Sequence, residues 1–70
     1  MTNTALLKKR INDSGYKKSY IAKTIGLSAY GLALKIENKR EFKASEIEKI
    51  CILLGIDSSE ERCEIFLPNK

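Results

Sequence analysis

The sequence predicts an all-α protein, a single domain spanning residues 1–70, in which five helices form a bundle around a helix-turn-helix. Apolar residues recur three and four positions apart along the chain, which is the spacing that gives a helix one buried face. No Pro occurs before position 68, and the β-branched runs that are typical of strands are few. A chain of this length buries only about 60% of its unfolded surface, so we expect a marginal core unless a partner supports it.

The centre of the chain, residues 17–38, predicts two short helices separated by a glycine turn. Gly26 can adopt the positive φ that a tight turn between two helices demands. Leu27 is expected to fill the space between the two helices, and Ser28 to cap the second one. The apolar stripes are Ile21, Ala22 and Ile25 before the turn and Leu32 and Ile36 after it.

Two more helices are predicted before and after this centre. The apolar spacing over residues 3–14 predicts the first helix, and Gly15 suits the left-handed residue that follows a helix end. Ser45 followed by Glu48 has the spacing of a capping box and predicts the start of the fourth helix, which continues to Gly55.

A short, acidic fifth helix is predicted at residues 59–65, because Ser58 followed by Glu61 repeats the capping-box spacing. The apolar residues 65–67 that precede Pro68 are too hydrophobic to remain in water. Two outcomes are open for them. They contact a second copy of the chain, or they pack back onto the first and fourth helices.

Positive charge is concentrated in the part of the chain that contains the predicted helix-turn-helix. Residues 1–43 hold ten Lys or Arg and three Asp or Glu, a net charge of +7, whereas residues 44–70 hold three and six, a net charge of −3. The two parts sum to the formal net charge of +4. This separation is typical of a nucleic-acid-binding face with an acidic back, and the alternative is ordinary surface charge.

The composition argues against a metal site and an active site. The chain has no His, and Cys51 and Cys63 have the spacing of neither a zinc site nor a redox pair. We expect both to be free thiols, with Cys51 buried in a helix. We therefore expect no cofactor, no small-molecule substrate and no enzymatic activity. No apolar run approaches the ~18 residues that span a bilayer, and the N-terminus lacks a hydrophobic signal region, so we expect a cytoplasmic protein without membrane contacts.

A set of motif residues covers most of the chain. In order they are Ile21-Ala22, Ile25-Gly26-Leu27-Ser28, Leu32, Lys35-Ile36, Phe42, Glu46-Ile47 and Leu53-Leu54-Gly55-Ile56. This set resembles the lambda-repressor-like helix-turn-helix family, and within it the small phage Cro-type regulators. The resemblance implies a five-helix lambda-repressor-like bundle that binds double-stranded operator DNA. We expect a repressor that acts as a homodimer and excludes polymerase from its operator.

The resemblance also implies that the outward face of the second motif helix enters the major groove and reads bases. A rotation of about 100° per residue places Ala29, Leu32 and Ile36 toward the core. Tyr30 is expected to hydrogen-bond a base edge or a phosphate, and Leu34 to touch a thymine methyl. Relatives usually carry Arg, Gln or Asn on this face, and the alternative is that Leu34 packs against a dimer mate or the following loop. The expected base-reading residues are Ser28, Ala29, Tyr30, Ala33 and Leu34.

Phosphate contacts are expected from two segments. Lys17 and Lys18 stand where the relatives usually carry Thr and Gln, so positive charge lies at a positive helix end, which a DNA phosphate would relieve. The basic loop over residues 38–43 runs along the DNA backbone in the family. The expected phosphate-contacting residues are Lys17, Lys18, Ser19, Lys35, Asn38, Lys39, Arg40 and Lys43.

A second class of function is also compatible with the sequence. A protein-interaction module, similar to an antirepressor or an antitoxin, would use the helix-turn-helix face and the apolar tail to bind another protein. The lack of long hydrogen-bonding side chains on that face favours this alternative, and the basic character of residues 1–43 opposes it.

Overall fold

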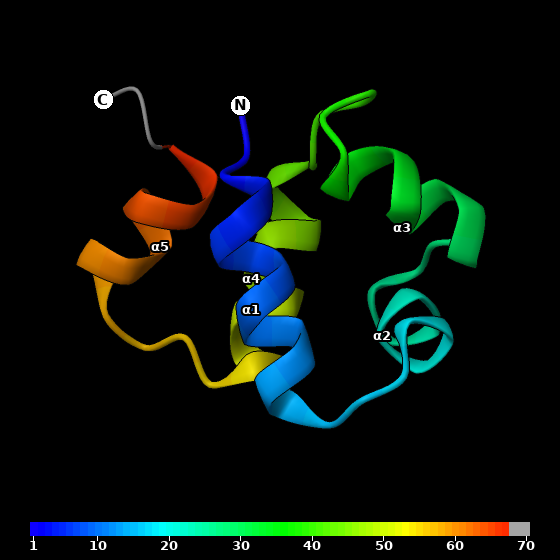
Figure 1. Cartoon of the computed structure of the whole chain (residues 1–70), viewed down its shortest axis with the longest axis horizontal. Helices are drawn as coiled ribbons and strands as arrows, with labels where there is room; N and C mark the ends of the chain where they lie inside the picture. The colour runs from blue at the N-terminus through cyan, green and yellow to red at the C-terminus, as the bar shows by residue number, and fades with distance from the viewer. Residues whose placement is uncertain (68–70) are drawn as a thin grey trace.

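The protein is all-α, as predicted. The computed structural model describes residues 1–67, and this range contains five helices and no strand. In Figure 1, α1 and α4 lie at the centre, α2 and α3 lie on one side of them, and α5 lies on the other. No helix within the described range is long and apolar enough to cross a membrane. The helices are α1 (Thr4–Ser14), α2 (Lys18–Ile25), α3 (Ala29–Ile36), α4 (Ala44–Leu54) and α5 (Ser59–Phe66).

One apolar core joins all five helices. The helix α1 packs against α3, α4 and α5, while α2 packs against α3 and α4. Burying one aliphatic side chain contributes about 1.5–3 kcal/mol. Packing of these side chains, rather than helix propensity, therefore stabilises α2, α3 and α5, which have only eight residues each. Each helix supplies at least one nearly inaccessible side chain: Leu7, Ile21, Leu32, Ile50 and Ile65.

The helix α4 begins earlier than predicted. Ser45 and Glu48 are exposed and do not form the expected capping box. Lys43 instead precedes the helix, and its backbone N–H donates to Glu46 Oε1 at 2.9 Å. The prediction was wrong because Glu46 is buried in an ion pair with Lys35 of α3, whereas Glu48 forms no ion pair within residues 1–67.

The end of α5 packs back into the molecule. Ile65 and Phe66 are buried in the core, and the ring of Phe66 meets that of Phe42 edge-on, with 5.6 Å between ring centroids. Back-packing is therefore the outcome for these two residues. Leu67 remains 46% exposed. Pro68, which the sequence places at the end of the apolar tail, lies outside the described residues.

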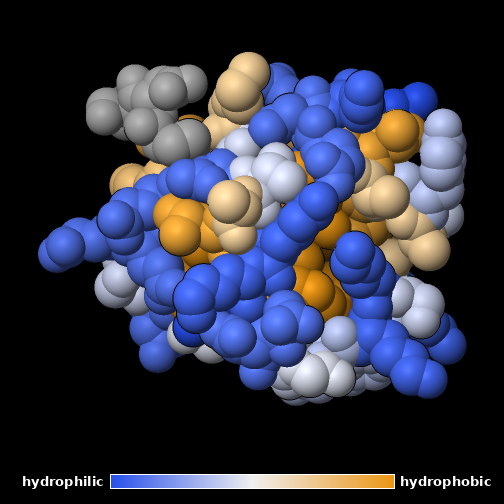
Figure 2. Space-filling view, viewed as in Figure 1, coloured by the Kyte–Doolittle hydropathy of each residue, from blue (hydrophilic) through white to orange (hydrophobic). Residues whose placement is uncertain are grey.

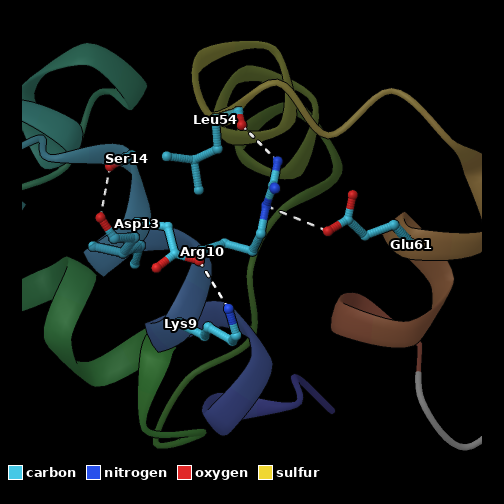
Figure 3. A network of polar contacts seen from close by, with 7 residues as sticks. Lys9, Arg10, Asp13, Ser14, Leu54 and Glu61 are labelled. Carbon is cyan, nitrogen blue, oxygen red and sulfur yellow. Dashed lines mark hydrogen bonds and ion pairs between the residues drawn. The ribbon is translucent and has the colours of Figure 1, made fainter.

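Arg10 joins α1 to both α4 and α5 (Figure 3). Its Nη2 donates to the carbonyl oxygen of Leu54 at 2.7 Å, and its Nε lies 3.3 Å from Glu61 Oε2. Leu54 is the last residue of α4, and carbonyls at a helix end have no partner within the helix. One guanidinium therefore provides a hydrogen-bond donor for the last carbonyl of α4 and holds α5 beside α1.

The residues before α1 tie the end of α3 to the end of α5. Asn38 Oδ1 accepts the Thr2 N–H at 2.8 Å, and Asn38 Nδ2 donates to the Thr2 carbonyl at 2.8 Å. The Asn3 N–H donates to the Ile65 carbonyl at 2.6 Å. Asn38 has a φ of 63°, a left-handed conformation that Asn tolerates better than most residues. These contacts bring the start of the chain beside the end of α5 (Figure 1).

A buried ion pair joins α3 to α4. Lys35 Nζ lies 2.5 Å from Glu46 Oε1, and both side chains are only 9% exposed. Burial raises the pKa of the Glu46 carboxyl. Hydrogen bonds from Lys35 and the Lys43 backbone, together with the positive charges of these two residues, outweigh burial and hold that pKa below its ordinary value. Ionised Glu46 therefore stabilises the folded chain.

We expect Glu46→Gln to lower the free energy of unfolding by about 3 to 5 kcal/mol at neutral pH, because it leaves the Lys35 charge buried without a counter-charge. The pKa of Glu46 is lower in the folded than in the unfolded chain, so this stabilisation is present above about pH 4.5 and is lost as the pH falls through the folded pKa. Urea unfolding at several pH values measures the deficit, which should shrink below about pH 4.5. Glu48→Gln, exposed on the same helix, is the control, and equal deficits for both variants would contradict the prediction.

Candidate nucleic-acid interface

The helices α2 and α3 are consecutive and joined by a short turn that sets the direction of α3. Gly26 has a φ of 85°, a conformation that residues with a side chain rarely adopt, as predicted. The Leu27 N–H donates to the Ala22 carbonyl at 2.8 Å, and the Leu27 side chain packs against the core. Ser28 Oγ accepts the Gly31 N–H at 3.0 Å, which confirms the predicted cap of α3.

The helix α3 buries one face and exposes another. Leu32 and Ile36 are buried, as predicted. Ala29 was expected toward the core but is exposed, because α3 reaches the core only one turn later, at Leu32. The predicted base-reading residues are thus mostly accessible: Ser28, Ala29, Tyr30 and Ala33 are exposed, and Leu34 is half-buried.

Tyr30 is the most exposed aromatic residue in the described part of the chain, at 75%. Leu34 lies where the loop after α3 turns back, and its carbonyl accepts the Lys39 N–H at 2.8 Å. Because the Leu34 side chain is half-buried, we expect it to contribute to stability as well as to any contact made by this face. Figure 2 shows hydrophilic residues over most of one face of the molecule, interrupted by paler and orange residues at its centre, on its left and on the side where α3 lies in Figure 1.

Two residues of the predicted phosphate-contacting set are used inside the fold. Lys35 was expected to contact a DNA phosphate, but it is buried and its ammonium group is paired with Glu46. Asn38 was expected to face the DNA backbone, but both polar atoms of its side chain bind the backbone of Thr2. Neither side chain is free to contact a phosphate in this conformation, so both are removed from the set.

The remaining predicted contacts form two exposed groups, one at the start of α2 and one in the loop after α3. No side chain within residues 1–67 caps α2, so its first backbone N–H groups have no side-chain acceptor. A helix N-terminus flanked by lysines favours an anion. The exposed members are Lys17, Lys18 and Ser19 at α2 and Lys39, Arg40 and Lys43 in the loop.

Glu37, which directly follows α3, lies among these lysines. Its Oε2 is 2.6 Å from the Nζ of Lys8 on α1, and both side chains are about half-exposed. The hydrogen bond and the charge of Lys8 lower the pKa of Glu37, burial opposes them, and the charges of Lys18 and Lys39 lower it further. Sequence reasoning missed this cluster, because residues on three separate segments give no local pattern.

A cleft of about 410 Å³ lies between α1 and the start of α2. Lys8 of α1 and Lys18 of α2 both line it, so the cleft joins the α1 surface to the lysines of α2. The exposed ring of Tyr16 stands beside that of Tyr20, with 5.3 Å between centroids. The lining residues are Lys8, Ile11, Asn12, Gly15, Tyr16 and Lys18.

The cysteines take no part in this surface. Cys51 is buried, as predicted, and Cys63 is exposed; both are free thiols. Over residues 1–67, no three His, Cys, Asp or Glu side chains lie close enough together to hold a metal ion.

Models of known protein families, curated proteins and solved structures were compared with this chain, and none of them matches it. Its function is therefore inferred from its own residues and their arrangement.

Replacement of an inward residue of α3 should affect the stability of the fold, whereas replacement of an outward residue should affect DNA binding. We expect Leu32→Ala to lower the free energy of unfolding by about 2 to 5 kcal/mol, because it leaves a cavity in the core. Tyr30→Ala should leave melting almost unchanged but cost about 1 to 3 kcal/mol on a preferred DNA site, with little loss on random duplex. Thermal melting and DNA titrations measure the two quantities.

Tyr30→Phe keeps the ring and removes only the hydroxyl, so it separates an apolar contact from a hydrogen bond. Leu34→Ala should have an intermediate effect on melting because that residue is half-buried. If Tyr30→Ala lowers the melting temperature while the site preference survives, the outward face of α3 is a packing surface.

Proposed function

We propose that this chain is a sequence-specific DNA-binding transcriptional regulator of the lambda-repressor-like helix-turn-helix type, with α2 and α3 as the helix-turn-helix and α3 in the major groove. The observation that supports this most is an exposed, uncharged face on α3 that is flanked along the chain by two exposed basic groups. Apolar side chains in a major groove can contact thymine methyls, and flanking lysines can neutralise phosphates.

The two kinds of contact have different roles in this proposal. Lys17 and Lys18 at the start of α2, with Lys39 and Arg40 in the loop, position the protein on the DNA backbone without reading sequence. Tyr30 and its exposed neighbours on α3 supply discrimination between bases.

The regulatory role that we propose is that of a phage-type repressor in the cytoplasm. A domain of this size would act by occupying its operator and excluding polymerase. The role needs no cofactor, metal ion or small-molecule substrate.

We further propose that the chain binds DNA as a homodimer. Ile65 and Phe66 are used in the core, so the dimer surface rests on the apolar residues that remain accessible nearby. Met1 is 72% exposed and Leu67 is 46% exposed, and both line a hollow of about 150 Å³ at the end of α5. A two-fold dimer would bury this surface in both copies.

A second candidate is a protein-interaction module similar to an antirepressor or an antitoxin. It is favoured by the α3 face, where no Arg, Asn or Gln projects beside the exposed ring of Tyr30. Such a module would bind its protein partner at that face, and it would bind random duplex weakly and with little dependence on salt.

The two candidates differ in their response to salt. If each subunit neutralises about four to six phosphates, the logarithm of DNA affinity should fall with the logarithm of salt concentration at a slope of about −0.9 per phosphate. Titrations of random duplex at two salt concentrations measure this slope, and a flat response would exclude the DNA-binding proposal. Lys39→Gln and Arg40→Gln should each reduce the slope by about one unit, whereas Lys49→Gln, exposed on α4, should leave it unchanged.

A dimer predicts an operator with two-fold symmetry and half-site centres one helical turn apart, about 34 Å. Selection from a random DNA pool should recover such a palindrome, and light scattering at micromolar concentration should detect two copies on it. Leu67→Lys should weaken this assembly, whereas Ile52→Lys, exposed on α4, should not. Recovery of an asymmetric site bound by one copy would contradict the dimer.

A further inference from the structure

Glu37 is an acidic residue within the basic surface described above. Residues 1–43 hold three acids, and the other two do not lie in such a cluster: Asp13 pairs with Lys9 on its own helix, and Glu41 forms no ion pair within residues 1–67. Glu37 instead contacts a lysine from another helix, with 2.6 Å between Glu37 Oε2 and Lys8 Nζ.

The ion pair between Lys8 and Glu37 is too exposed to be explained by stability. Its side chains are 48% and 49% exposed, and water and salt screen the attraction between such partners. The position of this ion pair, among other lysines of the basic surface, matters more than its strength. Lys8 and Lys18 line one cleft, and Lys39 is hydrogen-bonded through its backbone to the last turn of α3, directly before Glu37.

A DNA phosphate that docks among these lysines has to compete with the Glu37 carboxylate. Both are anions that accept hydrogen bonds from an ammonium group, and the carboxylate is already 2.6 Å from Lys8. The phosphate also meets the negative charge of Glu37 directly. The affinity for every DNA sequence is therefore lowered to the same extent, because all sequences carry the same phosphates.

We propose that Glu37 acts as an internal competitor of DNA phosphates, which withholds Lys8 from the DNA backbone and weakens binding to all duplex sequences alike. This inference rests on the proposed DNA-binding function. It assigns Lys8 as a latent phosphate-contacting residue that sequence reasoning did not include. Its effect is to keep affinity for random DNA low, which matters because a regulator meets a large excess of non-specific sites.

The test compares Glu37→Gln with Glu41→Gln on random duplex. Both variants raise the net charge by one, but only Glu37→Gln frees a lysine. One additional phosphate contact steepens the salt slope by about 0.9, so the ratio of affinities at 50 and 200 mM salt should grow by about 3.5-fold for Glu37→Gln. Glu41→Gln should raise affinity slightly without steepening the slope.

A second pair of variants separates this effect from a change in the fold. Lys8→Gln breaks the same ion pair without freeing a cation, so its slope should equal that of the unsubstituted chain. Combining Lys8→Gln with Glu37→Gln should remove the gain. Thermal melting of each variant establishes that it is folded under the assay conditions.

The outcomes distinguish the two proposals. Salt-dependent binding by the unsubstituted chain with equal slopes for Glu37→Gln and Glu41→Gln would overturn this inference alone. Weaker binding by folded Glu37→Gln would also overturn it, because Glu37 would then orient Lys8 toward the phosphate. A flat salt response of the unsubstituted chain would overturn the proposed function and this inference together.

Discussion

The Glu46 carboxylate fixes where α3 lies relative to α4. The helix α3 buries only Leu32, Lys35 and Ile36, and two aliphatic side chains alone do not determine how a short helix is rotated about its axis. The Glu46 oxygen adds direction, because it accepts hydrogen bonds from both the Lys35 ammonium group and the Lys43 N–H. A buried ion pair is not a strong source of net stability compared with apolar residues of the same size. We therefore interpret this one as a device that selects a single orientation of α3.

Polar contacts at the ends of the helices add to the stability that the small apolar core provides. Carbonyl groups in the last turn of a helix have no partner within it and must find one elsewhere. Thr4 Oγ1 donates to the Ile36 carbonyl at the end of α3 at 2.6 Å, and Arg10 donates to the Leu54 carbonyl at the end of α4. Each donor comes from α1. The central helix thus holds its neighbours by their ends as well as through the core, and it thereby keeps α3 in place on one side and α5 on the other.

Features of the fold that depend on residues close together in the sequence could be predicted from the sequence. Helical spacing of apolar residues indicated the first four helices, and the capping-box spacing of Ser58 and Glu61 indicated the fifth. Ser28 and Ser58 each accept an N–H from the third residue beyond, as their positions predicted. The start of α4 could not be predicted in this way. Locally, Ser45 is a better cap than Lys43, and the choice is made by Glu46 through a partner on another helix. The all-α class could be predicted from the sequence, because that prediction requires only the period of the apolar residues.

The candidate site shows the same division between local and distant causes. The exposure of Tyr30 and Ala33 followed from helical geometry, whereas the burial of Lys35 and the use of Asn38 depended on partners far away in the sequence. What remains outward on α3 has no charge and no amide. If α3 enters a major groove as proposed, it cannot form the bidentate hydrogen bonds by which Arg reads guanine or Asn reads adenine. Apolar contact with a thymine methyl is then its main means of discrimination, aided by the Tyr30 hydroxyl, so the bases opposite α3 should be rich in thymine.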